Sequence, residues 1–257
     1  MNRENTLLKR LAGNYRIWRL YHLVVADAMA VQRPTKYKPV REFLGDSLGV
    51  AADIGCGPGV FIRHMSARAR YVVAADIDCD SLDRVRLRHK NLNNVKFILT
   101  SADVLPLPDE HLDTILLLEV LEHLVDDNAA VREMSRVLRP GGRLVVSVPV
   151  PPGEVNHDSA WGHKREGYEL SEIVSLLTTN GFEVEKHSFA EFKFSRLAAQ
   201  AIRWWRKAIR LPAPIFLAWI AYLDHLLDTK KTETGSQLPA TVVVLARKRR
   251  KASHICP

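Results

Sequence analysis

The 257-residue sequence predicts an α/β fold in which a doubly wound, mostly parallel sheet carries helices on both faces. Short apolar runs rich in β-branched residues alternate with segments of helical period through the centre of the chain. The runs are continuous, as expected for strands that are buried on both faces. A glycine-rich turn joins the first run to the first helical segment. Strands that alternate with helices connect through right-handed crossovers, which gives the expected parallel order.

Seven strands are expected along the chain. The five central strands and the helices between them are expected at residues 50–54, 61–68, 71–75, 82–92, 95–99, 114–118, 129–138 and 144–148. Ser171 is a suitable N-cap for a helix over 172–180, and Gly181 ends that helix before a strand over 182–189. A last strand over 240–246 completes the sheet after a helical insertion.

Charge divides the chain into segments of different character. An N-terminal helical basic segment over 1–47 carries nine Lys or Arg against four acids, and the core over 48–191 carries fifteen against twenty-two. An amphipathic helical insertion over 192–239 and a last strand with a basic tail over 240–257 together carry thirteen against three. The net charge of +8 therefore lies in the flanks, which favours an anionic partner, either phospholipid or nucleic acid. Solvated helix faces with a basic tail are the alternative explanation.

Composition excludes several classes of protein. Three scattered cysteines, Cys56, Cys79 and Cys256, form no CxxC pair, which indicates a reducing compartment and no cysteine metal cluster. The first residues lack the compact apolar core of a secretory signal, and no stretch approaches the ~18 apolar residues of a membrane-spanning helix. The expected location is the cytoplasm, with peripheral association on the inner face of the membrane as an open alternative.

The strongest local signal is DIGCGPGVF, which runs from Asp53 to Phe61. Three glycines at alternate positions let the backbone approach a ligand closely, at a helix start that offers free N–H groups. The spacing GxGxG, with an acid two residues before the first glycine, differs from the GxGxxG of enzymes that bind a pyrophosphate. A carboxylate here suits a cofactor that carries a sulfonium and an ammonium group.

A second signal is Asp76, which ends the second expected strand 21 positions after Gly55. A carboxylate at a strand tip can accept hydrogen bonds from both hydroxyls of a ribose. Asp76 could instead cap the next helix, but Asp78 and Asp80 are better placed for that role. The spacing therefore favours a nucleoside cofactor.

Four motifs, DIGCGPG, AADIDCDSL, SADVLPLPDEHLDTILLLEVLEHL and SRVLRPGGRLVVSVP, resemble those of the class I, Rossmann-like S-adenosylmethionine-dependent methyltransferases. The resemblance covers about residues 45–190 and is strongest to the small-molecule group that contains the ubiquinone-biosynthesis enzymes. It implies a turn into the fifth strand at residues 139–142, and Cys56 as a small filler of the glycine loop. It implies that the cofactor is bound by Asp53, Gly55, Gly57, Gly59 and Glu119 around the methionine part, by Asp76 on the ribose, and by Ala102, Asp103 and Val104 around the adenine. Cys56 and Ile77 are expected to line the same site.

The resemblance leaves the acceptor chemistry open. Displacement at a sulfonium-activated carbon needs mainly positioning and desolvation, so a general base is optional. If the acceptor is a hydroxyl, His123 and His163 are the candidate catalytic bases, because both are expected near the carboxyl edge of the sheet.

A metal site is the alternative use of this region. Glu119, Glu122 and His123, with His157 or His163, resemble the divalent-metal site of the ribose methyltransferases that modify small-RNA ends, and a similar pattern in quinone-pathway enzymes. The preferred interpretation is metal-free, with Glu119 on the cofactor and Glu122 on a solvated helix turn. The reaction is therefore expected to run without added metal.

Residues 192–228 combine Trp204 and Trp205, among basic side chains, with an apolar stretch over 215–223. The pattern suits an interfacial hairpin or a lid over the acceptor pocket. A helix pair packed on the sheet edge is the alternative.

Taken together, these signals predict an S-adenosylmethionine-dependent methyltransferase that O-methylates a small-molecule or lipid-linked acceptor at an anionic membrane surface. A nucleic-acid methyltransferase, acting on RNA for example, is less favoured because the aromatic cluster lies beside an apolar run and not along a positive groove. The third hypothesis is a non-enzymatic cofactor-binding module associated with the membrane.

Overall fold

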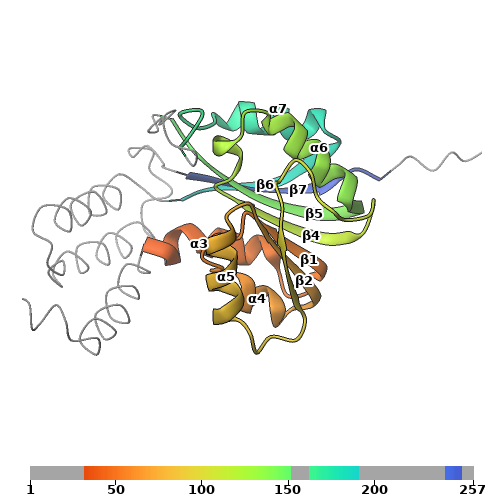
Figure 1. Ribbon diagram of the computed structural model, residues 1–257. Coiled ribbons are helices and arrows are strands. Elements are labelled where there is room, and N and C mark those ends of the chain that lie inside the picture. Colours follow the sequence, from red (N-terminus) through yellow and green to blue (C-terminus); the bar gives the residue numbers. More distant parts are fainter. Residues whose placement is uncertain (1–31, 152–161, 191–240, 251–257) are drawn as a thin grey trace, which may run out of the picture. The chain divides into compact units, whose positions relative to one another are not determined.

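The computed structural model describes residues 32–151, 162–190 and 241–250 (Figure 1). The described residues from Pro39 to Ala190, together with those from Thr241 on, belong to one compact unit. Several predictions lie outside the described residues. They concern most of the segment 1–47, the insertion 192–239, the tail beyond 250 and His157.

A seven-stranded sheet forms the centre of the unit. Its strands are β1 (Gly49–Ile54), β2 (Ala69–Asp76), β3 (Val95–Leu99), β4 (Leu112–Leu118), β5 (Leu138–Pro149), β6 (Phe182–Ala190) and β7 (Thr241–Lys248). The strand order is β3-β2-β1-β4-β5-β7-β6. Strands β1 to β5 pair in parallel, whereas β7 runs antiparallel between β5 and β6. The predicted Rossmann-like, doubly wound, mostly parallel fold is thus confirmed.

Helices cover both faces of this sheet. They are α3 (Gln32–Leu44), α4 (Ile62–Ser66), α5 (Cys79–Arg88), α6 (Asp127–Val137) and α7 (Leu170–Thr179). Figure 1 shows α6 and α7 on one face and α4 and α5 on the other. Because both faces are covered, Ala52 of β1 and Leu116 and Leu117 of β4 have no exposed surface. Burying each leucine side chain contributes about 1.5–3 kcal/mol to folding. Because helices cover both faces, the loops at the strand ends are the part of the sheet that can form a site.

The predicted turn at residues 139–142 lies inside β5 and not ahead of it. Leu112 of β4 pairs with Leu138, whereas Thr114 pairs with Arg143, so the four residues in between leave the ladder. Gly141 has a φ of +80°, which allows the chain to turn back into register. The turn is therefore a bulge that joins two paired parts of one strand.

Capping residues set the helix starts. The Asp78 side chain accepts a hydrogen bond from the backbone N–H of Asp80, so α5 begins three residues before the predicted helix. The helix α4 has no side-chain cap and is shorter than predicted at both ends. The predicted Ser171 cap of α7 is wrong, because Glu169 is the N-cap and its backbone N–H donates to the Glu172 carboxylate at 2.7 Å. Gly181, with a φ of +86°, follows the end of α7 as predicted.

Candidate functional site

The glycine-rich loop connects β1 to α4 at the carboxyl edge of the sheet. Gly55, Gly57 and Gly59 have φ values of +69°, +47° and +70°, a region that side-chain-bearing residues rarely adopt. A Cβ on Gly55 would lie 2.4 Å from a Val120 methyl, and one on Gly59 would lie 2.6 Å from a Val85 methyl. A Cβ on Gly57 would meet no atom within 4 Å. Two glycines are therefore required by packing, and the third exposes backbone to open space where a ligand can approach.

Asp76 connects this loop to the tip of β2. Its Oδ2 accepts the backbone N–H of Gly57 at 2.7 Å, and its Oδ1 accepts the N–H of Asp78 at 2.9 Å. The carboxylate is largely buried, and each of its oxygens can accept a further hydrogen bond. Arg88 of α5 donates to the Pro58 carbonyl at 2.9 Å, which holds the far side of the loop. The Asp76 carboxylate, which is predicted to accept hydrogen bonds from a ribose, is thus held in place by backbone N–H groups of the protein itself.

Asp53 lies one residue before the end of β1, between Ala74 of β2 and Leu116 of β4. Burial, followed by the negative charge of Asp76, raises the pKa of Asp53 to about 7. A cationic ligand group beside it would favour its ionised form. Burial also raises the pKa of the Cys56 thiol, so Cys56 is a neutral filler at physiological pH, as interpreted from the sequence.

Apolar side chains are exposed beside Asp76. Ile77 follows β2 and is 57% exposed, and Val104 follows the neighbouring strand β3 and is 68% exposed. Asp103 is also exposed and accepts a hydrogen bond from the Ser101 hydroxyl. Ala102 instead packs in the main hydrophobic core. Of the three residues predicted around the adenine, Asp103 and Val104 can therefore offer side chains to a planar ligand, whereas the Ala102 side chain faces the core.

Glu119 follows the last residue of β4 with a φ of +53°, one of two described non-glycine residues with a positive φ. Such a conformation costs about 1–2 kcal/mol for a residue with a side chain. Ser147 of β5 fixes it, because the Ser147 hydroxyl donates to Glu119 Oε1 at 2.8 Å and the Glu119 N–H donates to the Ser147 carbonyl at 3.0 Å. Backbone strain of this kind gathers at functional sites. Ser147 is a site residue that the sequence analysis missed.

Glu122, His123 and His163 come together just after β4, and we call them the acceptor cluster. Each offers one ligand atom, and these atoms lie within 4.8 Å of one another. The His123 and His163 rings meet edge to face, with centroids 4.8 Å apart. The expectation that Glu122 lies on a solvated turn is wrong, because its side chain has no exposed surface. The 3-10 helix η1 (Leu121–His123) turns Glu122 inward and leaves His123 partly exposed.

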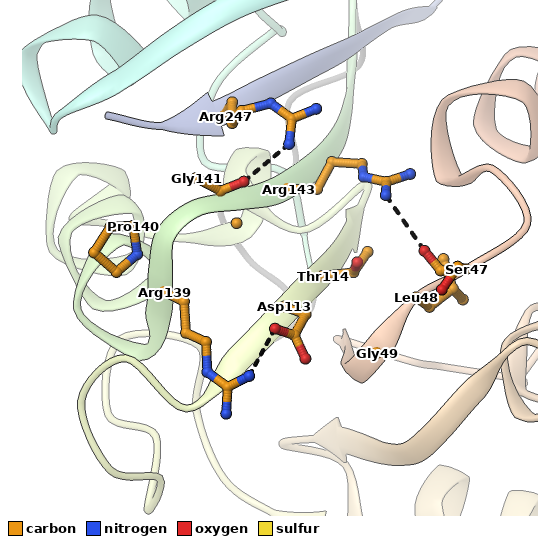
Figure 2. Close-up of a pocket in the computed structure, with 11 residues that line it drawn as sticks. Ser47, Leu48, Gly49, Asp113, Thr114, Arg139, Pro140, Gly141, Arg143 and Arg247 are labelled. Atoms are coloured by element: carbon orange, nitrogen blue, oxygen red, sulfur yellow. Dashed lines mark hydrogen bonds and ion pairs between the residues drawn. The ribbon is translucent and has the colours of Figure 1, made fainter. Parts of the chain in front are cut away.

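A separate hollow of about 410 Å³ lies at the opposite, amino-terminal edge of the sheet (Figure 2). Arg139 pairs with Asp113 at 2.8 Å, Arg143 donates to the Ser47 carbonyl at 3.3 Å, and Arg247 donates to the Gly141 carbonyl at 2.9 Å. These guanidinium groups are thus engaged by other protein atoms around the hollow. The contacts stabilise the β5 bulge against its neighbours, on the far side from the glycine-rich loop.

The comparisons with known proteins agree with this geometry. The methyltransferase domain family matches residues 52–146, which run from β1 into β5. Over these residues the chain thus carries a methyltransferase domain. Its cofactor is S-adenosylmethionine.

Curated relatives match about half of the chain. The ubiquinone/menaquinone biosynthesis C-methyltransferase of Shewanella baltica is 34% identical over 137 residues, which are 52% of this chain and 49% of the relative. A Mycolicibacterium smegmatis protein, whose name includes the words S-adenosylmethionine-dependent methyltransferase, is 36% identical over 137 residues, or 52% and 51% of the two chains. The chain spans about half the length of the curated relatives it matches.

Solved structures support the fold. An S-adenosylmethionine-dependent methyltransferase from Mesorhizobium loti matches with a TM-score of 0.55 and 19% identity, over 83% of this chain and 98% of that chain. The cyclase SpnF matches with a TM-score of 0.56 and 22% identity, over 86% and 82%. One fold thus carries proteins named for different reactions, so the reaction has to be argued from the site.

No helix among the described residues is long and apolar enough to cross a membrane.

Proposed function

We propose that this protein transfers the methyl group of S-adenosylmethionine to an oxygen of a small-molecule or lipid-linked acceptor. The observation that carries the proposal is the contact between Asp76 and Gly57, which joins a predicted ribose acceptor to the one open glycine of the loop. When bound, the cofactor supplies a methyl group that is activated by its positively charged sulfur.

The residues at the carboxyl edge fit such a cofactor. Asp76 would accept the ribose hydroxyls, and the open backbone at Gly57 would lie along the methionine part. The carboxylates of Asp53 and Glu119 would face its cationic groups. Ile77 and Val104 would cover the adenine, which would shield their exposed surfaces from water.

The acceptor cluster supports an oxygen acceptor. Val120 packs against Gly55 of the glycine loop and is followed directly by η1, so His123 comes three residues after a contact with that loop. Imidazoles here could assist the loss of a hydroxyl proton, because histidine is the commonest general base in enzymes. The sequence prediction that His123 and His163 act on the acceptor thus becomes part of this proposal.

The nature of the acceptor is argued from the relatives and from the sequence. The Shewanella relative is named for ubiquinone and menaquinone biosynthesis, which supports an apolar small molecule as the acceptor class. The aromatic and apolar residues of 192–228 support an acceptor that is reached from a membrane surface, although this segment lies outside the described residues. The Shewanella relative is named as a C-methyltransferase, which makes carbon the competing acceptor atom.

Labelled cofactor tests the proposal. The purified protein is incubated with S-adenosylmethionine that carries a deuterated methyl group and with a metabolite and lipid extract, and products are found by mass spectrometry. We expect a labelled small molecule or lipid, and carbon NMR of the product distinguishes an O-methyl from a C-methyl group. Asp76→Asn, which is expected to bind the cofactor more weakly, is the control and should label less product at a limiting cofactor concentration. Label that appears only in RNA, or a cofactor that binds and is never consumed, would overturn the proposal.

A further inference from the structure

We infer that the hollow of Figure 2 binds the phosphate group of a small phosphorylated molecule, through Arg143 and Thr114. The hollow lies at the amino-terminal edge of the sheet, whereas the residues proposed to bind the cofactor lie at the carboxyl edge. S-adenosylmethionine carries no phosphate group. The inference therefore goes beyond the proposed function and concerns a second site.

The register of the sheet places the binding side chains in one row. Thr114 of β4 pairs with Arg143 of β5, and Arg143 pairs with Arg247 of β7. Side chains of register partners project to the same face of a sheet, so Figure 2 shows Arg143 between Arg247 and Thr114. Like charges that lie directly opposite each other destabilise an antiparallel pair. An anion bound beside the row would offset this repulsion between Arg143 and Arg247.

The positive charge of Arg143 has no carboxylate partner within the described part of the chain. Arg247 is paired with the Glu185 carboxylate at 2.5 Å, and Arg139 is paired with Asp113 at 2.8 Å. Arg143 instead donates to two backbone carbonyls ahead of β1, which carry no net charge. Burial, followed by the positive charge of Arg247, lowers the pKa of Arg143. A bound anion would favour the charged form of this guanidinium group.

Two buried donors at the same wall lack an acceptor among the described residues. They are the Thr114 hydroxyl and the Nε–H of Arg143. Thr114 is only 1% exposed, so the surrounding solvent does not satisfy its hydroxyl group. A donor that is buried without an acceptor is costly and needs a physical explanation. Donors beside an unpaired guanidinium charge match the acceptor oxygens of a phosphate, which arginine recognises in preference to uncharged groups.

The rest of the lining is compatible with an anion. It includes three arginines and one acidic residue, Asp113. Both oxygens of Asp113 are already engaged, because Oδ1 pairs with Arg139 and Oδ2 accepts the Val50 N–H at 2.8 Å. The Asp113 charge is therefore balanced inside the protein and does not face an incoming anion alone.

The size of the hollow indicates a small ligand. Its volume of about 410 Å³ lies in the range of small-molecule sites. A polymeric anion such as RNA is instead bound along an extended basic groove. The hollow thus favours one phosphate group together with a small organic part, such as a sugar.

An NMR titration of the full chain tests the site. Protein labelled with ¹⁵N is titrated with inorganic phosphate and with ribose 5-phosphate at constant ionic strength, and ribose is the uncharged control. We expect saturable shifts of the backbone N–H signals of Thr114 and Arg143 with both phosphates and none with ribose. Affinity for phosphate should fall by more than about 10-fold in Arg143→Gln, and by about 3- to 10-fold in Thr114→Val.

Two controls separate binding from folding. Arg86→Gln removes the same charge from the exposed side of α5 and should bind phosphate normally. Thr114→Val removes a hydroxyl that has no partner, so without ligand this variant should resist urea at least as well as the parent protein. Weaker binding without a loss of stability distinguishes a ligand site from a purely structural role. Thr114→Val therefore decides the matter even if Arg143→Gln does not fold.

Several results would overturn the inference. One is the absence of saturable shifts with either phosphate, and another is a set of shifts confined to the glycine-rich loop. Equal affinity in Arg143→Gln, Thr114→Val and Arg86→Gln would indicate an adventitious ion only. An RNA oligonucleotide that shifts the same signals at lower concentration than ribose 5-phosphate would identify a polymeric ligand instead. None of these results bears on methyl transfer, which the labelled cofactor tests separately.

Discussion

The Asp76 carboxylate accepts the backbone N–H of Gly57 at 2.7 Å and so connects the tip of β2 to the loop that follows β1. The two strands are direct neighbours in the sheet, and the Ala75 carbonyl accepts hydrogen bonds from the backbone N–H groups of Gly55 and Cys56. The loop is therefore shaped by the strand beside it. A change at Asp76 should affect both the loop and the ligand that the loop holds.

Asp76→Asn should lower the affinity for S-adenosylmethionine by about 5- to 150-fold, which corresponds to about 1–3 kcal/mol. Both carboxylate oxygens of Asp76 accept backbone N–H groups, so an amide would point its NH₂ group at one of these donors. Isothermal titration calorimetry measures the affinity. Asp78→Asn is the matched control, because Asp78 caps α5 and should leave cofactor affinity unchanged. Equal losses in both variants would contradict a ribose role for Asp76.

Gly57→Ala and Gly59→Ala should separate binding from folding. A side chain at Gly57 meets no atom within 4 Å, so Gly57→Ala should cost only about 1–2 kcal/mol of stability, from its positive φ, while it blocks the cofactor. Gly59→Ala adds a contact of 2.6 Å with Val85 and should lose about 2–4 kcal/mol in total. Urea unfolding and calorimetry provide the two measurements. Normal cofactor affinity in Gly57→Ala would show that the open side of the loop does not face the cofactor.

Peripheral binding to anionic membranes is expected from the sequence of residues 192–228. Trp204 and Trp205 among basic residues favour the headgroup region, and each basic residue near the surface adds about 1 kcal/mol. Binding to phosphatidylglycerol vesicles should therefore weaken as salt is raised, with a salt-resistant part from the apolar stretch 215–223. Co-sedimentation measures it, and phosphatidylcholine vesicles are the control. No binding at low salt, or unchanged binding after deletion of 200–227 in a folded protein, would contradict the expectation.

The fold could be predicted from the sequence because local signals agree with the global arrangement. Short apolar runs gave every strand of the parallel core to within a few residues, except that β5 begins at Leu138. That extension depends on pairing between Leu112 and Leu138, which is a tertiary contact. The start of α7 was misplaced for a related reason, since the reciprocal bond between Glu169 and Glu172 takes precedence over the hydroxyl of Ser171.

The positions of the candidate site residues could be predicted only where they follow from the order of the strands. The glycine loop and Asp76 have fixed spacing, so their placement at one edge follows from the topology. The burial of Glu122 depends on η1, whose three residues carry no strong periodic signal. The approach of His163 depends on a backbone bond from Lys164, across a separation of about 40 residues. The support of Glu119 by Ser147 likewise joins two strand ends that only the register brings together.

Cofactor binding should release protons through Asp53. Burial and the Asp76 charge raise the pKa of Asp53 from 3.8 to about 7 in the folded protein, so the folded state holds a proton that the unfolded chain releases above pH 4. The contribution of Asp53 to stability is therefore present below about pH 4 and is lost as pH rises towards 7. The ammonium and sulfonium of the cofactor favour the ionised form and oppose this shift.

The affinity for S-adenosylmethionine should therefore rise with pH up to about 7 and then level off, as ionised Asp53 becomes available without the loss of a proton. Calorimetry at pH 6 in two buffers with different ionisation enthalpies measures the proton release, which should approach one per cofactor bound. Asp53→Asn should abolish that release, weaken binding at pH 8 and make the cofactor-free protein more stable at that pH, because it buries no charge. A binding heat that does not depend on the buffer would mean that Asp53 is already ionised in the free protein, and the proposed contact with a cationic group would lose its support.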